Sequence, residues 1–135
     1  MVTYTLEKNL SPEEFREVLV QSGLGARRPV EDLERIRGMV TNANLILTAR
    51  DSGRLIGVAR SVTDFVYCTY LSDLAVHQTH QGKGIGTELI RRTKLHAPQA
   101  KLILLSAPAA IAYYPKIGMS RHEHCYFLDD VKLLK

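Results

Sequence analysis

The segment from Gln81 to Thr87 reads Gln-Gly-Lys-Gly-Ile-Gly-Thr, with glycine at every second position. A β-prone apolar run precedes it and helical spacing follows it, so the segment is expected to join a strand to a helix. At such a junction, successive backbone N–H groups and the positive end of the helix dipole can bind phosphate oxygens. Side chains would obstruct that approach. The spacing therefore predicts a phosphate-binding loop rather than a simple turn.

Two common phosphate-binding motifs do not fit this loop. A Walker loop requires Gly-Lys followed by Ser or Thr, but Gly82 and Lys83 are followed by Gly84. A dinucleotide fingerprint requires the spacing G-x-G-x-x-G, and here the third glycine comes one position early. That fingerprint also requires an acidic residue about 20 residues later, where this chain has none. Both kinds of nucleotide site are thus disfavoured.

The histidines offer a second, weaker source of chemistry. A metal ion could be bound by His122 and His124, which are followed by Cys125. No third ligand lies at a suitable spacing from these residues, so no metal site is predicted. His77 and His80 flank the glycine loop and are expected to make local contacts rather than to act as catalytic bases.

These residues need a scaffold, and the pattern of apolar residues predicts one α/β domain over residues 1–135. The expected strands cover residues 2–7, 45–49, 55–62, 65–76, 102–105 and 121–128. Helices are expected at 11–21, 30–41 and 108–114, and from the glycine loop to just before Pro98.

Connections between these elements predict the sheet. Ser11, Pro12 and Glu14 form a helix-start signal, and Asp51-Ser52-Gly53 is a strong hairpin turn signal. A helix between the strands at 65–76 and 102–105 should make them parallel neighbours, which gives a mixed sheet. The continuous apolar run at 102–105 is typical of a strand buried on both faces.

Composition and charge exclude several classes of protein. Hydrophobic residues make up 45% and charged residues 24%, which is ordinary for a globular domain. The first eight residues do not resemble a signal peptide, and no apolar run approaches the roughly 20 residues of a membrane span. Cys68 and Cys125 lack CxxC spacing and are expected to be buried, reduced thiols. A cytoplasmic protein without a membrane partner is expected.

The net charge of +4 is too modest to indicate nucleic acid by itself. The stretch between Glu88 and Glu123 contains basic residues but no acid. It is equally consistent with a solvated basic face and with a polyanionic ligand nearby.

Two markers carry a resemblance to a known family. The run from Asp73 to His77, followed by Gln81–Gly86, resembles the acetyl-CoA signature Q/R-x-x-G-x-G/A of the GNAT N-acetyltransferase superfamily. Downstream, Ala110–Met119 is similar to the second marker of that family, A-x-x-F-Y-x-x-x-G-F, at the expected distance. The expected element order also agrees over nearly the whole chain. The resemblance implies a GNAT-like fold and acetyl-CoA as the co-substrate.

The resemblance also assigns cofactor contacts. It implies that the strand before the loop is splayed from its parallel neighbour, so that the pantetheine arm pairs with the exposed backbone there. The residues that it would place at the cofactor are Leu74, Ala75, Val76, Gln81, Gly82, Lys83, Gly84, Ile85, Gly86, Thr87 and Tyr113. The loop residues would hold the pyrophosphate through backbone amides, with Lys83 and either Arg91 or Arg92 near the phosphates.

By the same resemblance, Tyr114 is the acid that protonates the departing thiolate. Asp73 adjoins the thioester site and either acts as the base toward the amine or sits in another contact, with a water relay as the alternative base. The chain departs from the family pattern at two positions. Ala107 replaces an asparagine that contacts the cofactor, and Met119 stands where phenylalanine is usual.

The expected function is acetyl transfer to a primary amine of a small molecule or peptide, and no sequence signal identifies that acceptor. A non-catalytic acyl-CoA-binding module is the alternative, favoured slightly by Ala107 and disfavoured by Tyr114. Nucleic-acid binding lacks a recognisable motif. A homodimer is plausible by the resemblance alone.

Overall fold

The computed structural model describes all 135 residues as two compact units, Met1–Leu105 and Ser106–Lys135. The predicted single domain stays a prediction, and the units are described separately below. The first unit contains the strands β1 (Val2–Leu6), β2 (Leu45–Asp51), β3 (Arg54–Thr63), β4 (Cys68–Val76) and β5 (Lys101–Ile103). Its helices are α1 (Pro12–Ser22), α2 (Leu33–Asn42) and α3 (Ile85–His96). The second unit contains the short helix α4 (Tyr113–Lys116). No helix has both the length and the apolar character needed to cross a bilayer.

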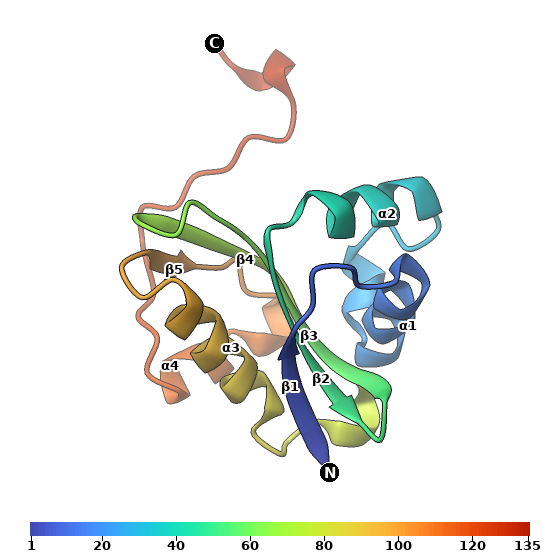
Figure 1. The fold of residues 1–135 in the computed structure, drawn as a ribbon. Coiled ribbons are helices and arrows are strands. Elements are labelled where there is room, and N and C mark those ends of the chain that lie inside the picture. The colour runs from blue at the N-terminus through green and yellow to red at the C-terminus, as the bar shows by residue number, and fades with distance from the viewer. The chain divides into compact units, whose positions relative to one another are not determined.

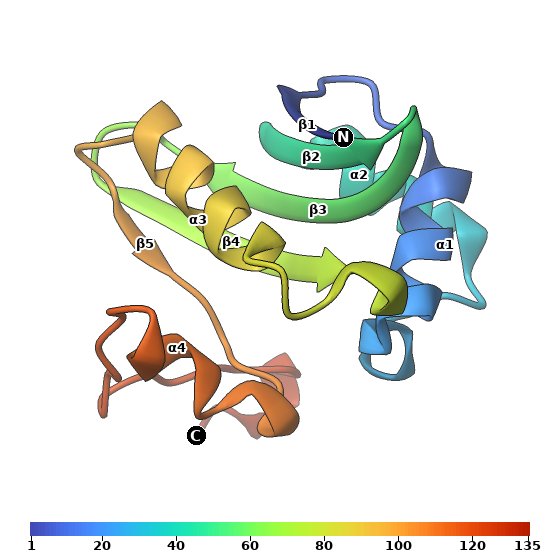
Figure 2. The same ribbon diagram turned by 90° about the horizontal axis from the view of Figure 1, so that it is seen from below.

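The strands of the first unit form a five-stranded sheet in the order β1-β2-β3-β4-β5 (Figure 1). β1 to β4 pair antiparallel, whereas β4 and β5, which are connected through α3, pair parallel. The predicted mixed sheet is therefore confirmed. β5 pairs only with the first part of β4, Cys68–Tyr70, so the rest of β4 has no strand neighbour on that side (Figure 2).

Helices cover both faces of this sheet, α1 and α2 on one face and α3 on the other (Figure 1). Each face of the sheet has its own hydrophobic core, and alternate residues of β2 pack into one core or the other, because successive side chains of a strand point to opposite faces. Ile46 packs in the core beneath α1 and α2, whereas Leu45 and Leu47 pack in the core beneath α3. Helix α3 lies so close to β3 that a Cβ atom at Gly57 would come within 3.2 Å of a side-chain carbon of Ile85.

Side-chain caps explain where the first two helices begin. The backbone N–H of Glu14 donates to Ser11 Oγ at 3.2 Å, so α1 starts at Pro12 as predicted. The predicted start of the second helix near Val30 is wrong by three residues. Helix α2 starts at Leu33, because the carboxylate of Asp32 accepts the N–H of Arg35 at 3.1 Å and caps the helix there.

The sequence predicted the β2–β3 turn correctly but placed the start of β4 too early. Ser52 (φ 51°) and Gly53 (φ 87°) both adopt left-handed conformations, as a type I′ turn requires, which confirms the β2–β3 hairpin. The predicted strand start at Phe65 is wrong, since Phe65 lies in a turn with a φ of 69°. Asp64 Oδ1 accepts the N–H groups of residues 66, 67 and 68, and these bonds hold the pKa of Asp64 at about 2. β4 therefore begins only at Cys68.

Two other strand predictions also differ from the structure. The strand at 102–105 exists as β5, but it is not buried on both faces, because the side chains of Ile103 and Leu105 are about half exposed. The predicted strand at 121–128 is wrong, since these residues are exposed and form no strand. A strand needs a partner for its backbone groups, and no residue of the second unit pairs with another in a ladder.

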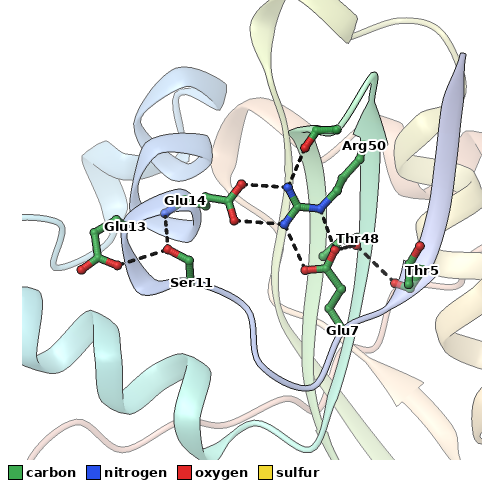
Figure 3. A network of polar contacts seen from close by, with 8 residues as sticks. Thr5, Glu7, Ser11, Glu13, Glu14, Thr48 and Arg50 are labelled. Carbon is green, nitrogen blue, oxygen red and sulfur yellow. Dashed lines mark hydrogen bonds and ion pairs between the residues drawn. The ribbon is translucent and has the colours of Figure 1, made fainter.

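The guanidinium of Arg50, in β2, joins α1 to Glu7, the residue that follows β1 (Figure 3). Its Nε and one Nη donate to the carboxylate of Glu7 at 2.7 and 3.1 Å, and both Nη atoms donate to that of Glu14 at 2.7 and 3.0 Å. A fifth bond reaches the carbonyl of Gly53 at 2.9 Å. All five N–H groups are thus used, and the hydrogen bond from Arg50 is the main cause that lowers the pKa of Glu7.

We expect Arg50→Met to lower the free energy of unfolding by about 2 kcal/mol, because two partly buried carboxylates lose their shared cation. Solvent around Glu14 keeps the loss below the roughly 3–5 kcal/mol of a fully buried pair. Urea denaturation measures the difference. Arg16→Met is the matched control, since Arg16 is exposed and has no ion pair, and it should change the free energy by less than about 0.5 kcal/mol. Equal effects of the two substitutions would contradict a structural role for this cluster.

Candidate functional site

The glycine loop lies where the sequence placed it, between β4 and α3. Gly82 (φ 77°) and Gly84 (φ 82°) adopt left-handed backbone conformations that side chains disfavour, and nothing lies within 4 Å of a Cβ atom built on either. Gly84 is also the N-cap of α3, and no side chain caps this helix. A helix N-terminus without a side-chain cap suits an anionic ligand.

Gln81 anchors the start of this loop. Its side-chain amide donates to the carbonyl of Val76 at 2.9 Å and to that of Ser22 at 3.2 Å. It thus ties the loop to the last residue of β4 and to the C-terminus of α1. The side chain of Gln81 is engaged within the protein, so a contact with a cofactor would come from its backbone.

A chain of hydrogen bonds holds the residues just before Gln81. Nδ1 of His77 accepts the backbone N–H of Thr79 at 3.2 Å and shares a hydrogen bond with the Thr79 hydroxyl at 2.9 Å, while Nε2 of His77 lies 3.0 Å from an Nη atom of Arg54. The Thr79 hydroxyl also shares a hydrogen bond with Nδ1 of His80 at 2.7 Å, and Nε2–H of His80 donates to Asp51 at 2.9 Å. Burial, and secondarily the charge of Arg54, lowers the pKa of His77, which agrees with a neutral ring. The local contacts expected of both histidines are confirmed.

The end of β4 offers free backbone groups along one edge. A register shift opposite Arg60 and Ser61 makes Ser72 a bulge residue, and regular pairing with β3 resumes at Asp73. The N–H of His77 donates to Ile56 of β3 at 2.7 Å. Because backbone groups alternate along a strand, those of Leu74 and Val76 point away from β3, toward the side that β5 leaves unpaired. The carbonyl of Val76 already accepts the amide of Gln81, so Val76 offers its N–H group and Leu74 offers both of its groups. An extended polar chain could bind there as an added strand.

Asp73 lies beside this edge but is completely buried. One carboxylate oxygen accepts Nε–H of Arg28, and the other accepts Nε–H of Arg60. Of the two alternatives left open by the sequence, the structure thus places Asp73 in another contact. A role as base stays a prediction. The sequence gave no signal for these partners, because Arg28 is 45 residues away from Asp73 along the chain.

The second unit holds Tyr113 and Tyr114 in the short helix α4, after a 3₁₀ turn at Pro108–Ala110 that replaces the start of the predicted helix. The N–H of Met119 donates to the carbonyl of Tyr114 at 3.0 Å, and Gly118, with a φ of 99°, donates to Pro115 at 3.2 Å. This is a Schellman motif, and it explains the glycine of the second marker, which ends the helix and fixes the backbone of Tyr114.

The phenol groups of these two tyrosines lie close together. Their rings pack edge to face, with centroids 5.1 Å apart. Burial raises the pKa of Tyr114, and the neighbouring Tyr113 raises it further. Tyr114 is therefore protonated at neutral pH, as a proton donor must be.

The cysteines, the possible metal ligands and Ala107 are the remaining candidates from the sequence. The expected burial of the cysteines is wrong, since Cys68 and Cys125 are both free and exposed. No cluster of three or more His, Cys, Asp or Glu side chains could hold a metal ion. Ala107 precedes the 3₁₀ turn and provides no side-chain cap to it.

Comparison with known proteins gives one family and several relatives. The profile described as the acetyltransferase (GNAT) family matches residues 10–119. An uncharacterised N-acetyltransferase of Prochlorococcus marinus is 30% identical over 109 residues, which are 76% of this chain and 59% of that protein. A second uncharacterised N-acetyltransferase, of Pyropia yezoensis, is 25% identical over 118 residues, which are 82% and 66% of the two chains. The chain thus spans only about three fifths of the first relative.

Solved structures show the same fold. A GNAT family acetyltransferase of Streptococcus pneumoniae aligns with a TM-score of 0.80 at 18% identity, covering 97% of this chain and 98% of that one. The aminoglycoside N-acetyltransferase AAC(6′)-Iy, solved in complex with CoA, aligns with a TM-score of 0.73 at 14% identity, covering 97% and 95%. At such identities the likeness concerns the fold alone, and it confirms the predicted GNAT-like architecture.

Proposed function

Because the chain belongs to the acetyltransferase (GNAT) family, we propose that it transfers the acetyl group of acetyl-CoA to a primary amine of a small molecule or peptide. One observation carries the proposal: the free edge of β4 at Leu74–Val76 leads into the uncapped glycine loop. Coenzyme A needs such a line of donors, since its pantetheine arm carries amides and its pyrophosphate carries negative charge.

In this proposal each part of the cofactor has its own contacts. The segment Leu74, Ala75 and Val76 binds the pantetheine arm, with the backbone hydrogen bonds coming from Leu74 and Val76, and the ring of Tyr113 packs beside the end of the arm. The backbone amides of Gln81–Thr87 bind the pyrophosphate, with the exposed side chain of Lys83 near the phosphates.

The chemistry is a direct transfer. The neutral amine attacks the thioester carbonyl carbon, so that the C–N bond forms and the carbonyl oxygen becomes an oxyanion. The backbone N–H of Leu74 at the free edge stabilises that oxyanion, a contribution worth about 10² to 10³ in rate. The C–S bond then breaks, and the thiolate, whose thiol has a pKa near 8.5, takes its proton from Tyr114.

The amine must lose a proton, and the candidates for its base are a water molecule and Asp73. The contacts favour water. Both carboxylate oxygens of Asp73 already accept guanidinium N–H groups, and Asp73 has no exposed surface through which an amine could reach it. Asp73 then supports the site through the two arginines that it pairs.

A non-catalytic acyl-CoA-binding module is the second candidate, and Ala107 favours it, because a cofactor-contacting asparagine is usual at that position. It would use the same loop and strand edge without turnover. The cytoplasmic location and the homodimer stay predictions.

Titration calorimetry with acetyl-CoA and CoA, and with NAD and ATP in parallel, tests the cofactor assignment. We expect both CoA species to bind and the other two nucleotides not to bind. Thiol release from acetyl-CoA in the presence of amines then separates the enzyme from the binding module. Binding of NAD or ATP without binding of CoA would refute the proposed function and leave only the fold.

A further inference from the structure

The cluster of Arg28, Asp73 and Arg60 contains two guanidinium groups but only one carboxylate. The exposed fraction of the side chain is 22% for Arg28, 9% for Arg60 and 0% for Asp73. Neither arginine forms an ion pair with any other acid. The cluster therefore holds one uncompensated positive charge in largely buried surroundings, where such a charge is costly.

Only Arg28 can share that charge with a ligand. Arg60 is nearly buried, and its three nitrogens donate to Asp73, to the carbonyl of Met39 (3.1 Å) and to the hydroxyl of Ser72 (3.0 Å). Arg28 donates from Nε to Asp73 and from its two Nη atoms to the carbonyls of Arg27 and Ser72, both at 2.8 Å. A guanidinium has five N–H groups, so each Nη atom of Arg28 keeps one more to donate.

Arg28 contacts β4 close to the proposed thioester site. Arg28 belongs to the connection between α1 and α2, and it contacts the bulge residue Ser72. Ser72 is two residues before Leu74, whose backbone lies at the free edge of β4. Arg28 thus contacts β4 only two residues before the backbone that the thioester is proposed to meet, within reach of a group carried by the acceptor amine.

We propose that Arg28 is an anion subsite, and that the acceptor amine carries a carboxylate or phosphate group that Arg28 binds. This inference rests on the proposed acetyl transfer and names the class of its substrate. A planar guanidinium with N–H groups left on both Nη atoms suits the paired oxygens of such groups. Asp73 orients Arg28 and keeps its N–H groups in place.

Matched amine pairs test the proposal. The carboxylate pair is β-alanine and β-alaninamide, the phosphate pair is O-phosphoethanolamine and ethanolamine, and thiol release from acetyl-CoA is the readout. For at least one pair we expect the kcat/KM of the anionic member to exceed that of the neutral member by about 10- to 100-fold, mainly through KM. The pair with the larger ratio tells a carboxylate from a phosphate.

Two substitutions identify the residue responsible. Arg28→Gln should abolish the preference for the anionic amine, because kcat/KM should fall about 10- to 100-fold more for the anionic member of a pair than for the neutral member. A merely structural role would lower both by the same factor and keep the preference. Arg27→Ala is the matched control, because it removes a neighbouring exposed charge that has no ion pair, and it should keep the preference. No preference in the unaltered protein, or a preference that survives Arg28→Gln, would overturn the proposal.

A binding measurement covers the case in which none of these amines is acetylated. The melting temperature of the protein should rise with β-alanine or inorganic phosphate, and this rise should be absent in Arg28→Gln. No anion-dependent rise also overturns the subsite. Failure of the proposed function is distinguishable, because it appears as absent acetyl-CoA binding in calorimetry whatever the anions do.

Discussion

Gly84→Val is expected to weaken the binding of acetyl-CoA by about 10- to 100-fold, because charge-assisted hydrogen bonds to the pyrophosphate are lost. The left-handed φ of 82° disfavours a β-branched residue, and its side chain would fill the open space in front of the loop amides. Titration calorimetry measures the dissociation constant directly.

Gly53→Val separates the effect on the ligand from the effect on the backbone. Gly53 has a φ of 87° and nothing within 4 Å of a Cβ atom, so both substitutions impose a similar strain of about 1–2 kcal/mol. Gly53 lies in the β2–β3 turn and has no part in the loop. Its substitution should lower thermal stability like Gly84→Val but leave acetyl-CoA affinity intact. Equal affinities of the two variants would remove the glycine loop from the cofactor site.

The protein holds this loop in place before any ligand binds. Gln81 is bonded to β4 and to α1, and His80 is bonded through its ring to Thr79 and Asp51. The amides that follow are therefore oriented by contacts on their protein side. Such pre-organisation lowers the ordering cost of binding a flexible polyanion.

Local chemistry was predictable from the sequence wherever a short-range signal determines the backbone. Ser11 caps α1, Ser52 and Gly53 form the hairpin turn, and the alternating glycines mark the junction of β4 and α3. Asp64 carries a further local turn signal, since its side chain accepts three successive backbone N–H groups. The apolar character of residues 65–67 favours a strand instead, and the predicted strand therefore starts too early.

Contacts between distant segments were not predictable. The pairing of Asp73 with Arg28 and Arg60 requires the α1–α2 connection to contact the bulge of β4. The spacing of apolar residues along the sequence does not predict such a contact. The segment 121–128 shows the same limit. Its apolar and aromatic residues favour a strand, but the unit that contains it provides no ladder partner.

The largest effect on turnover is expected from Tyr114→Phe, which should lower kcat by about 10² to 10⁴. The substitution removes only the hydroxyl group, so the ring packing and the Schellman motif of α4 remain, and the affinity for acetyl-CoA should stay nearly unchanged. Thiol release under saturating acetyl-CoA measures kcat, and calorimetry measures the affinity. Tyr126→Phe makes the same chemical change at an exposed residue and should have no effect.

The pH dependence adds an independent test of the acid. A phenol donates a proton only while it is protonated, and burial raises the pKa of Tyr114 above its ordinary value of about 10. The midpoint of any loss of activity through ionisation of Tyr114 should therefore lie above about pH 10. In Tyr114→Phe this alkaline decline should disappear, because the residual transfer no longer uses the phenol. Unchanged kcat, or an alkaline decline that persists in the variant, would assign protonation of the thiolate to another group or to water.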